Sequence, residues 1–238
     1  MGFIYMAFRQ AAMLVISPGR ELLGIIGLSL LVSGTAVCLA SALGVGFASV
    51  LALSRRFPLR GAIMNIMNTF MGLPPVVVGL ALYLLLSNSG PLGFLQLLYT
   101  PKAMILAQFV IAFPIVTAIS HSAIVSIDPS ISSAAKTLGA TAVQHTWTLI
   151  REARFGIFSG IMAALGRVMA EVGAILIVGG NIKGFTRVMT TAIALETSQG
   201  DFELAIALGI VLITISLAVN SALFMIQKKG RRGFFYKS

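Results

Sequence analysis

The chain has 238 residues, of which 58% are hydrophobic and only 10% are charged, with a formal net charge of +10. Since a soluble domain carries about 25% charged residues to solvate its surface, this composition excludes a soluble enzyme. The net charge does not indicate a nucleic-acid partner, because the basic residues are spread over separate loops rather than gathered on one face.

Residues 1–20 are predicted to form an N-terminal helix lying at the membrane interface. Apolar residues recur there at helical spacing, Arg9 and Gln10 interrupt them, and Ser17-Pro18-Gly19 ends the pattern. A short amphipathic segment of this kind favours an interfacial helix over a membrane span. The pattern also lacks the small-residue cleavage site expected of a signal peptide.

Five long apolar segments follow, and we predict a membrane span in each: residues 22–53, 61–86, 103–127, 155–180 and 204–226. Each exceeds the roughly 20 apolar residues that cross a hydrocarbon core. Their apolar runs are continuous rather than alternating, so the spans are helices and the fold class is an all-α polytopic membrane protein.

Prolines fall inside two of the spans, Pro74 and Pro75 in the second and Pro114 in the third. Proline has no backbone N–H and leaves a carbonyl unpaired, so we expect both helices to kink. The kinks either line a path or hinge a gate for a transported solute, or they serve packing alone.

Residues 128–154, between the third and fourth spans, are predicted to form two short helices. Asp128 is a suitable N-cap, Pro129 suits a first helical position, and Gly139 is suited to end the first helix. This loop belongs to a single membrane domain, residues 21–228, which is followed by a basic tail at residues 229–238.

The basic residues predict the orientation of the chain. Counted by alternating loops, eleven Lys and Arg residues fall on one side, the side of residues 128–154, and five fall on the other. The richer side is cytoplasmic by the positive-inside rule, which places the N-terminus outside and the C-terminus inside. The basic tail then anchors the last span at the lipid headgroups.

The fourth span contains Arg167 and Glu171, which are four residues apart. If the helix is continuous they share one face and form an ion pair, which lowers the cost of two charges in a membrane. The pair lies either at the pathway or subunit interface, or serves as a static brace. Small residues crowd the same span and predict close contact with a two-fold-related copy: Gly160, Ala163, Ala164, Gly166, Ala170, Gly173 and Ala174.

Motifs for catalysis or cofactor binding are absent from the sequence. It contains no phosphate-binding Gly-x-x-x-x-Gly-Lys-Ser/Thr run and no metal-ligand spacing, and His121 and His145 lie far apart. The single cysteine, Cys38, excludes an intrachain disulfide and is expected to be an inert packing residue. We therefore expect a non-catalytic subunit that cannot hydrolyse ATP alone and holds no cofactor.

The run from Ser133 to Ala140 resembles the Glu-Ala-Ala-x-x-x-Gly loop of ATP-binding cassette (ABC) importer permeases. In that family a short helix docks into the ATPase subunit, and the resemblance assigns the coupling role to Ser133, Ala134, Ala135, Leu138, Gly139 and Ala140. Small alanines allow close approach, and glycine permits the sharp turn. Ser133 stands where the family usually has Glu, and Arg151-Glu152 where many members have Leu-Pro.

Further runs resemble the molybdate and tungstate permeases over roughly residues 25–226. They are Gly72 to Leu80, Gly90 to Gly93 and Ala170 to Ala174. Three runs resemble the tungstate branch in particular: Arg167 to Gly173, Gly179 to Ile182 and Gly184 to Thr191. The resemblance implies a type I ABC importer transmembrane domain in the inner membrane of a prokaryote. It also implies a homodimer, two cytoplasmic ATPases that bind ATP and Mg, and an extracytoplasmic oxyanion-binding protein.

Two alternatives remain. The first is an ABC permease for another solute, such as sulfate, phosphate or an amino acid. The second is a secondary transporter or channel that acts without ATP, which predicts acidic or histidine relays within the spans, where Arg167 and Glu171 are the main candidates. For an oxyanion permease we expect a wide hydrated path lined by small residues, hydroxyls and backbone, with high affinity residing in the binding protein.

Overall fold

The computed structural model describes residues 5–6, 8–9, 12–13, 16–17, 19–53 and 59–235, with side chains excluded at 223 and 226–235. The interfacial helix predicted for residues 1–20 falls largely outside the described residues, as do the side chains of the basic tail. All regular secondary structure in the described part is helical, as the sequence predicts.

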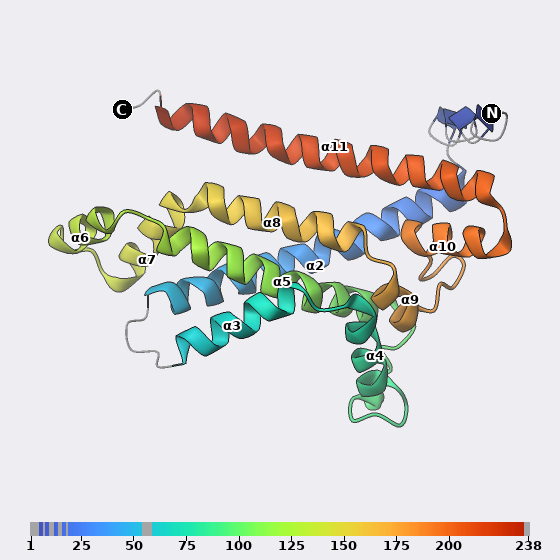
Figure 1. The fold of residues 1–238 in the computed structure, drawn as a ribbon, viewed down its shortest axis with the longest axis horizontal. Coiled ribbons are helices and arrows are strands. Elements are labelled where there is room, and N and C mark those ends of the chain that lie inside the picture. Colours follow the sequence, from blue (N-terminus) through green and yellow to red (C-terminus); the bar gives the residue numbers. More distant parts are fainter. Residues whose placement is uncertain are drawn as a thin grey trace.

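Long helices form the body of the molecule. Helices α2 (Arg20–Leu53), α5 (Pro101–Val125), α8 (Arg154–Met169) and α11 (Phe202–Phe235) run side by side along its length (Figure 1). Among the described residues, α2, α5 and α11 are long and apolar enough to cross a membrane by themselves. The predicted spans 22–53 and 103–127 are confirmed, and the last helix is longer than predicted.

The second predicted span is two helices. Helix α3 (Arg60–Met71) is followed, after a short break, by α4 (Pro75–Leu86), and the two axes differ by 104°. Pro74 is extended, with φ −63° and ψ 122°, and Pro75 begins α4. The kink predicted at these prolines is therefore a full break, after which α4 projects away from the bundle (Figure 1).

The fourth predicted span is also broken. Helix α8 ends at Met169, and α9 (Gly173–Gly179) follows at an angle of 60°. If the two helices of each bent pair cross the membrane together as one span, the described part of the chain has up to five spans, which is the number predicted. The continuous helix predicted for residues 155–180 is wrong.

Close packing between α4 and α9 accompanies the second break. A Cβ added at Gly79 of α4 would lie 2.8 Å from Ala174 Cα, and one added at Gly173 would lie 2.7 Å from Val76 Cγ2. The backbones approach this closely only because glycine has no side chain. Turning the chain after α8 therefore seats α9 directly against α4.

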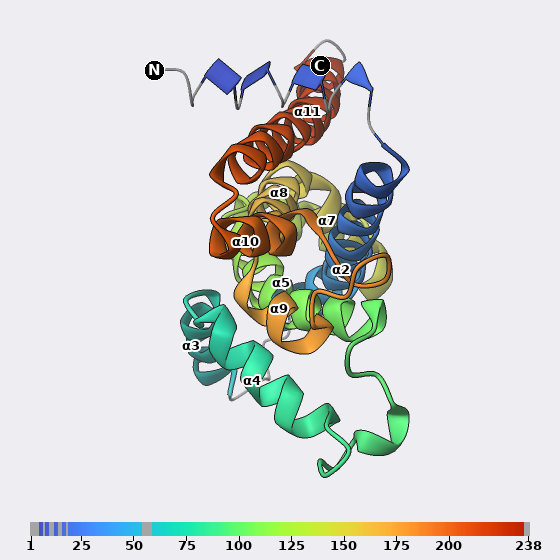
Figure 2. The ribbon, with the colours of Figure 1, turned by 90° about the vertical axis from the view of Figure 1, so that its right-hand side faces the viewer.

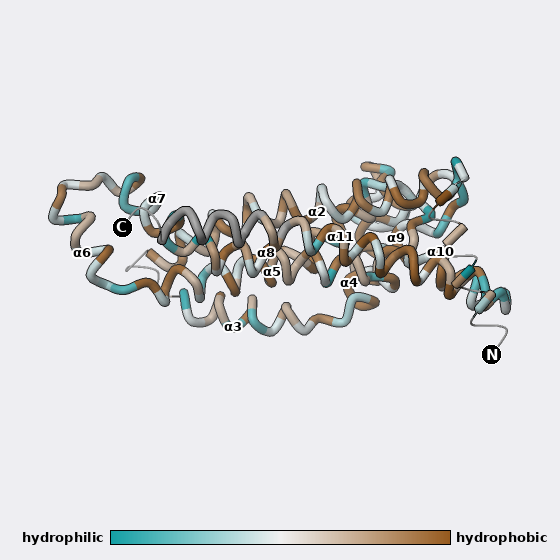
Figure 3. Tube along the Cα trace, turned by 90° about the horizontal axis from the view of Figure 1, so that it is seen from above, coloured by the Kyte–Doolittle hydropathy of each residue, from teal (hydrophilic) through white to brown (hydrophobic). Residues whose placement is uncertain are grey.

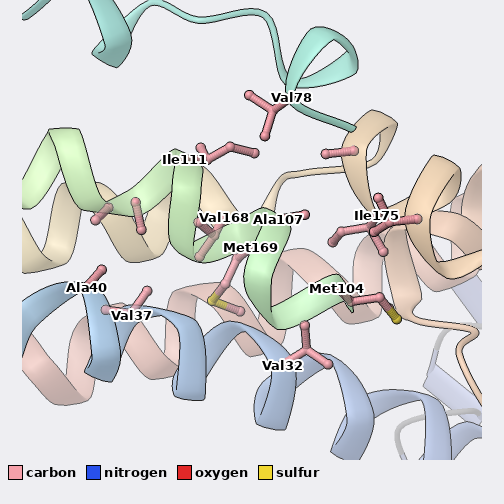
Figure 4. Packing of buried hydrophobic residues seen from close by; sticks show 14 of the residues in the cluster. Val32, Val37, Ala40, Val78, Met104, Ala107, Ile111, Val168, Met169 and Ile175 are labelled. Atoms are coloured by element: carbon pink, nitrogen blue, oxygen red, sulfur yellow. The ribbon is translucent and has the colours of Figure 1, made fainter. Parts of the chain in front are cut away.

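Helix α5 lies at the centre of the core. Met104 and Ala107 of α5 are buried against Val32 of α2 and Val168 of α8 (Figure 4). Pro114 is buried within α5, which continues through it as one helix. His121, near the far end of α5, has its Nε2 3.2 Å from Arg60 Nη2 and so links α3 to α5.

Three shorter helices lie near the ends of the bundle, and a single turn lies at the tip of α4. At one end, α6 (Pro129–Thr137) and α7 (Ala142–Glu152) protrude beyond the long helices, and hydrophilic and apolar segments alternate there (Figure 3). Helix α10 (Met189–Gln199) lies at the opposite end, and the single turn η1 (Gly93–Leu95) follows α4. Cys38 is exposed on α2, in contrast to the packing role expected for it.

Candidate functional site: a protruding helix pair and a broken helix

Helix α6 has the ends that the sequence predicts. Asp128 accepts a hydrogen bond from the N–H of Ser130 at 2.8 Å, and Pro129 is the first helical residue. This N–H and the Ser130 hydroxyl lower the pKa of the Asp128 carboxyl, so it is ionised as a cap. Gly139 follows the helix with φ +76°, a conformation that favours glycine.

Helix α7 begins with a capping box and is tied to α6. The N–H of Gln144 donates to Thr141 Oγ1 at 3.3 Å, and the Gln144 side chain accepts from the Thr141 N–H at 2.9 Å. Between the helices, Ser132 Oγ lies 2.8 Å from His145 Nε2. This role of His145 could not be predicted from the sequence, because a spacing of 13 residues carries no helical signal.

Three large apolar side chains on this helix pair face outward. Leu138 is 87% exposed, Val143 79% and Trp147 67%; we call these three residues the coupling surface. Of the residues assigned to ATPase coupling, Ser133, Ala134 and Gly139 are exposed alongside Leu138, whereas Ala135 and Ala140 are half-buried. Large apolar side chains left exposed beyond the end of a bundle are typical of a protein contact.

The ion pair expected between Arg167 and Glu171 is not formed. Because α8 ends at Met169, Glu171 lies in the break and not on the helical face of Arg167. Arg167 is exposed, whereas Glu171 is only 5% exposed. The one ion pair among the described residues joins Lys183 to Glu21. The prediction fails because it assumed an unbroken helix.

Glu171 is instead part of a network that holds the break. Its Oε1 accepts a hydrogen bond from the N–H of Ala174 at 3.0 Å, and its backbone carbonyl accepts from Thr190 Oγ1 at 2.8 Å. Gln108 Nε2 of α5 donates to the carbonyl of Val168 at 2.9 Å. Gln108 was detectable as a lone amide within an apolar span, whereas nothing in the sequence singled out Thr190.

The coupling surface and the break are connected by α8. This helix of 16 residues begins beside α7 and ends at the break, so about 24 Å of rigid helix separates its two ends. Movement of the helix pair relative to the bundle can therefore reach the break through one element. Pro74 and Pro75 lie at the start of α4, and α4 contacts α9 just after the break between α8 and α9.

This arrangement is that of a multi-pass transmembrane protein with a protruding helix pair. Its fold is that of ABC importer transmembrane domains: a crystal structure of a bacterial alginate ABC transporter, in complex with an alginate pentasaccharide-bound periplasmic protein, matches with a TM-score of 0.73. The match covers 94% of this chain and 86% of that chain at 20% identity. The chain belongs to the family described as binding-protein-dependent transport system inner membrane component, whose pattern matches residues 44–232.

Two relatives are similar over almost their whole length. The tungstate uptake system permease protein TupB of Peptoclostridium acidaminophilum is 41% identical over 96% of this chain and 100% of that protein. A probable anion ABC transporter permease protein of Haloferax volcanii is 42% identical over 89% of this chain and 94% of that protein. The resemblance to permeases of this branch is thus confirmed.

Proposed function

We propose that this chain is the permease subunit of an ABC importer that carries tungstate, or molybdate, across the cytoplasmic membrane. The observation that carries the proposal is the coupling surface, three exposed large apolar side chains on a protruding helix pair. The cargo follows from the relatives, since a tungstate permease is 41% identical over 96% of this chain. The permease itself performs no covalent chemistry and needs no cofactor.

The partner at the coupling surface is a cytoplasmic ATPase that binds ATP and Mg. Leu138, Val143 and Trp147 stay exposed although burying each large apolar side chain gains about 1.5–3 kcal/mol. The capped helix ends and the Ser132–His145 contact hold these side chains in place before the partner binds, which lowers the entropy cost of docking. When the two ATPase subunits move on binding ATP, they shift α6 and α7.

The second partner is another copy of this chain. On α8, added Cβ atoms at Gly156 and Gly160 would lie 2.5 Å from Ala123 Cβ and 3.0 Å from Ile119 Cβ, so these glycines pack within the chain. Ala163 and Gly166 of α8, and Ala170 directly after its end, instead remain exposed. Small residues on an exposed membrane helix favour close contact with a partner helix, which supports a homodimer with the path on its axis.

An extracytoplasmic binding protein delivers the oxyanion at the end opposite α6 and α7. A binding protein is present in the alginate transporter complex that shares this fold. The N-terminus then lies outside and the C-terminus in the cytoplasm, in agreement with the excess of basic residues on the side of α6 and α7.

Uptake into proteoliposomes that contain the permease, its ATPase and its binding protein tests the cargo. Tungstate inside the vesicles is measured by mass spectrometry, with molybdate, sulfate or phosphate in excess as competitors. We expect molybdate to compete and sulfate and phosphate to compete weakly. Saturable uptake of sulfate with no uptake of tungstate contradicts the proposal and favours the alternative of another ABC cargo.

A further inference from the structure

A second polar feature lies at the end of the bundle opposite the coupling surface. The loop between α9 and α10 passes across the start of α2 (Figure 2), and the two enclose a cleft of about 520 Å³. Arg20, Glu21, Gly24 and Gly27 line it from α2, and Gly184 and Arg187 line it from the loop. We call this space the outer cleft.

Arg187 projects from a rigid turn. The neighbouring Thr186 is fully buried, and its hydroxyl accepts a hydrogen bond from the N–H of Ile182 at 2.9 Å and donates to the carbonyl of Gly179 at 2.6 Å. Val188, on the other side, is 3% exposed. The backbone that carries Arg187 is therefore held on both sides.

The guanidinium of Arg187 is incompletely paired. Its Nε is buried and has no hydrogen-bond partner among the described residues. Buried donors in proteins are almost always paired, and a charged donor left unpaired is especially costly. Arg187 lines the outer cleft, which is large enough to hold an anionic acceptor for its guanidinium.

The charges around the cleft favour a doubly negative acceptor. Lys183 Nζ lies 3.0 Å from Glu21 Oε2, so this pair is neutral as a unit. The guanidinium groups of Arg20 and Arg187 remain, and neither has an ion-pair partner in the described part of the chain. Two guanidinium groups match a dianion in charge, and their planar forks match the geometry of its oxygens.

We propose that the outer cleft binds a tetrahedral oxyanion and is a weak loading site for the cargo. This inference deepens the proposed function and rests on it. The glycines on both walls leave the cleft open, since a Cβ added at Gly24, Gly27 or Gly184 meets nothing within 4 Å. A weak site suits an ion that must leave again, because tight binding would stop transport.

Direct binding measurements test the proposal. The complex of permease and ATPase, purified without binding protein, is dialysed against tungstate, and bound tungsten is quantified. We expect saturable binding that weakens at high salt. Arg187→Gln should reduce the affinity about tenfold or more, as for loss of a charge-assisted contact. Gly27→Leu, which keeps every charge and fills the cleft, should do the same.

The matched control is Lys102→Gln. Lys102 is exposed at the start of α5 and does not line the outer cleft, but its replacement removes one positive charge from the same end of the bundle. Its tungstate affinity should equal that of the unmodified complex. Equal affinity in Arg187→Gln, or an equal loss in Lys102→Gln, overturns the proposal.

The phosphate of a lipid headgroup offers the same oxyanion chemistry, so the source is tested separately. The measurement is repeated in nanodiscs of phosphatidylcholine alone and in nanodiscs that also contain phosphatidylglycerol. Arg187-dependent tungstate binding in both supports the cargo site. Arg187-dependent enrichment of phosphatidylglycerol without tungstate binding overturns it. Unchanged binding in Arg187→Gln alongside normal tungstate uptake refutes this inference alone, whereas absence of uptake in the unmodified transporter refutes the proposed function.

Discussion

The carboxylate of Glu171 accepts a hydrogen bond from the backbone N–H of Ala174 at 3.0 Å and so caps α9. An anionic side chain at a helix start is favoured by the helix dipole and satisfies an otherwise unpaired donor. Glu171 is thus fixed within the break between α8 and α9, and Arg167 plays no part in holding it there.

The first prediction follows from this separation. Arg167→Gln and Glu171→Gln should have additive effects on transport and stability, because the two side chains share no contact. A double mutant that transports better or is more stable than either single mutant would show that the two side chains form a pair in the working transporter.

Glu171→Ala and Glu171→Gln should also differ from each other. The alanine variant loses the acceptor for the Ala174 N–H and should lose about 1 kcal/mol of stability, whereas glutamine keeps an acceptor oxygen. Thermal unfolding in one detergent compares them. Equal melting temperatures for the two variants would rule out the capping role.

The coupling surface gives the second prediction. Leu138→Asp places a charge where an apolar contact forms, and should weaken association with the ATPase by about tenfold or more. Co-purification and ATPase affinity are measured at equal membrane insertion. Ser198→Asp, at the exposed end of α10, is the matched control and should retain association. Normal association of Leu138→Asp would refute the assignment.

The third prediction concerns the contact between Ser132 and His145. Ser132→Ala removes the hydroxyl that lies 2.8 Å from His145 Nε2, so α6 and α7 should no longer be held in one position relative to each other. We expect a several-fold rise in the ATP hydrolysed per tungstate imported, with insertion unchanged. An unaltered ratio would mean that the helix pair is held by other contacts.

The fourth prediction tests the contact between α4 and α9. Gly79→Ala places a Cβ 2.8 Å from Ala174 Cα, and such overpacking costs about 1–3 kcal/mol. Gly46→Ala on α2, where an added Cβ meets nothing within 4 Å, is the control and should not destabilise the protein. Thermal unfolding distinguishes them, and equal stability would show that α4 moves away from α9 in solution.

The sequence was informative where structure depends on local chemistry. Asp128, Pro129 and Gly139 act on neighbouring backbone, and they predicted both ends of α6. The runs of apolar residues likewise predicted the spans. The break after Met169 was not predicted, because it is accompanied by contacts between residues far apart in the chain, such as Gly79 with Ala174 and Gln108 with Val168. Glu171 was therefore recognised as important but given the wrong partner.

The same limit applies to Arg187. In the sequence it is one basic residue of a loop, within a run that resembles the tungstate branch. Only the fold shows that this loop crosses α2 and that Arg187 and Arg20 line one cleft. Contacts between residues distant in sequence leave no periodic signal, so such a site requires the structure.

The central claim is that a partner ATPase drives transport through this subunit. The most direct test is tungstate uptake into proteoliposomes holding the complete transporter, with proton and sodium gradients collapsed by ionophores. The account predicts that uptake continues with ATP on the side of α6 and α7, and that Leu138→Asp abolishes it. Uptake that stops when the gradients collapse, or proceeds without ATP, would contradict it and favour a secondary transporter or a channel.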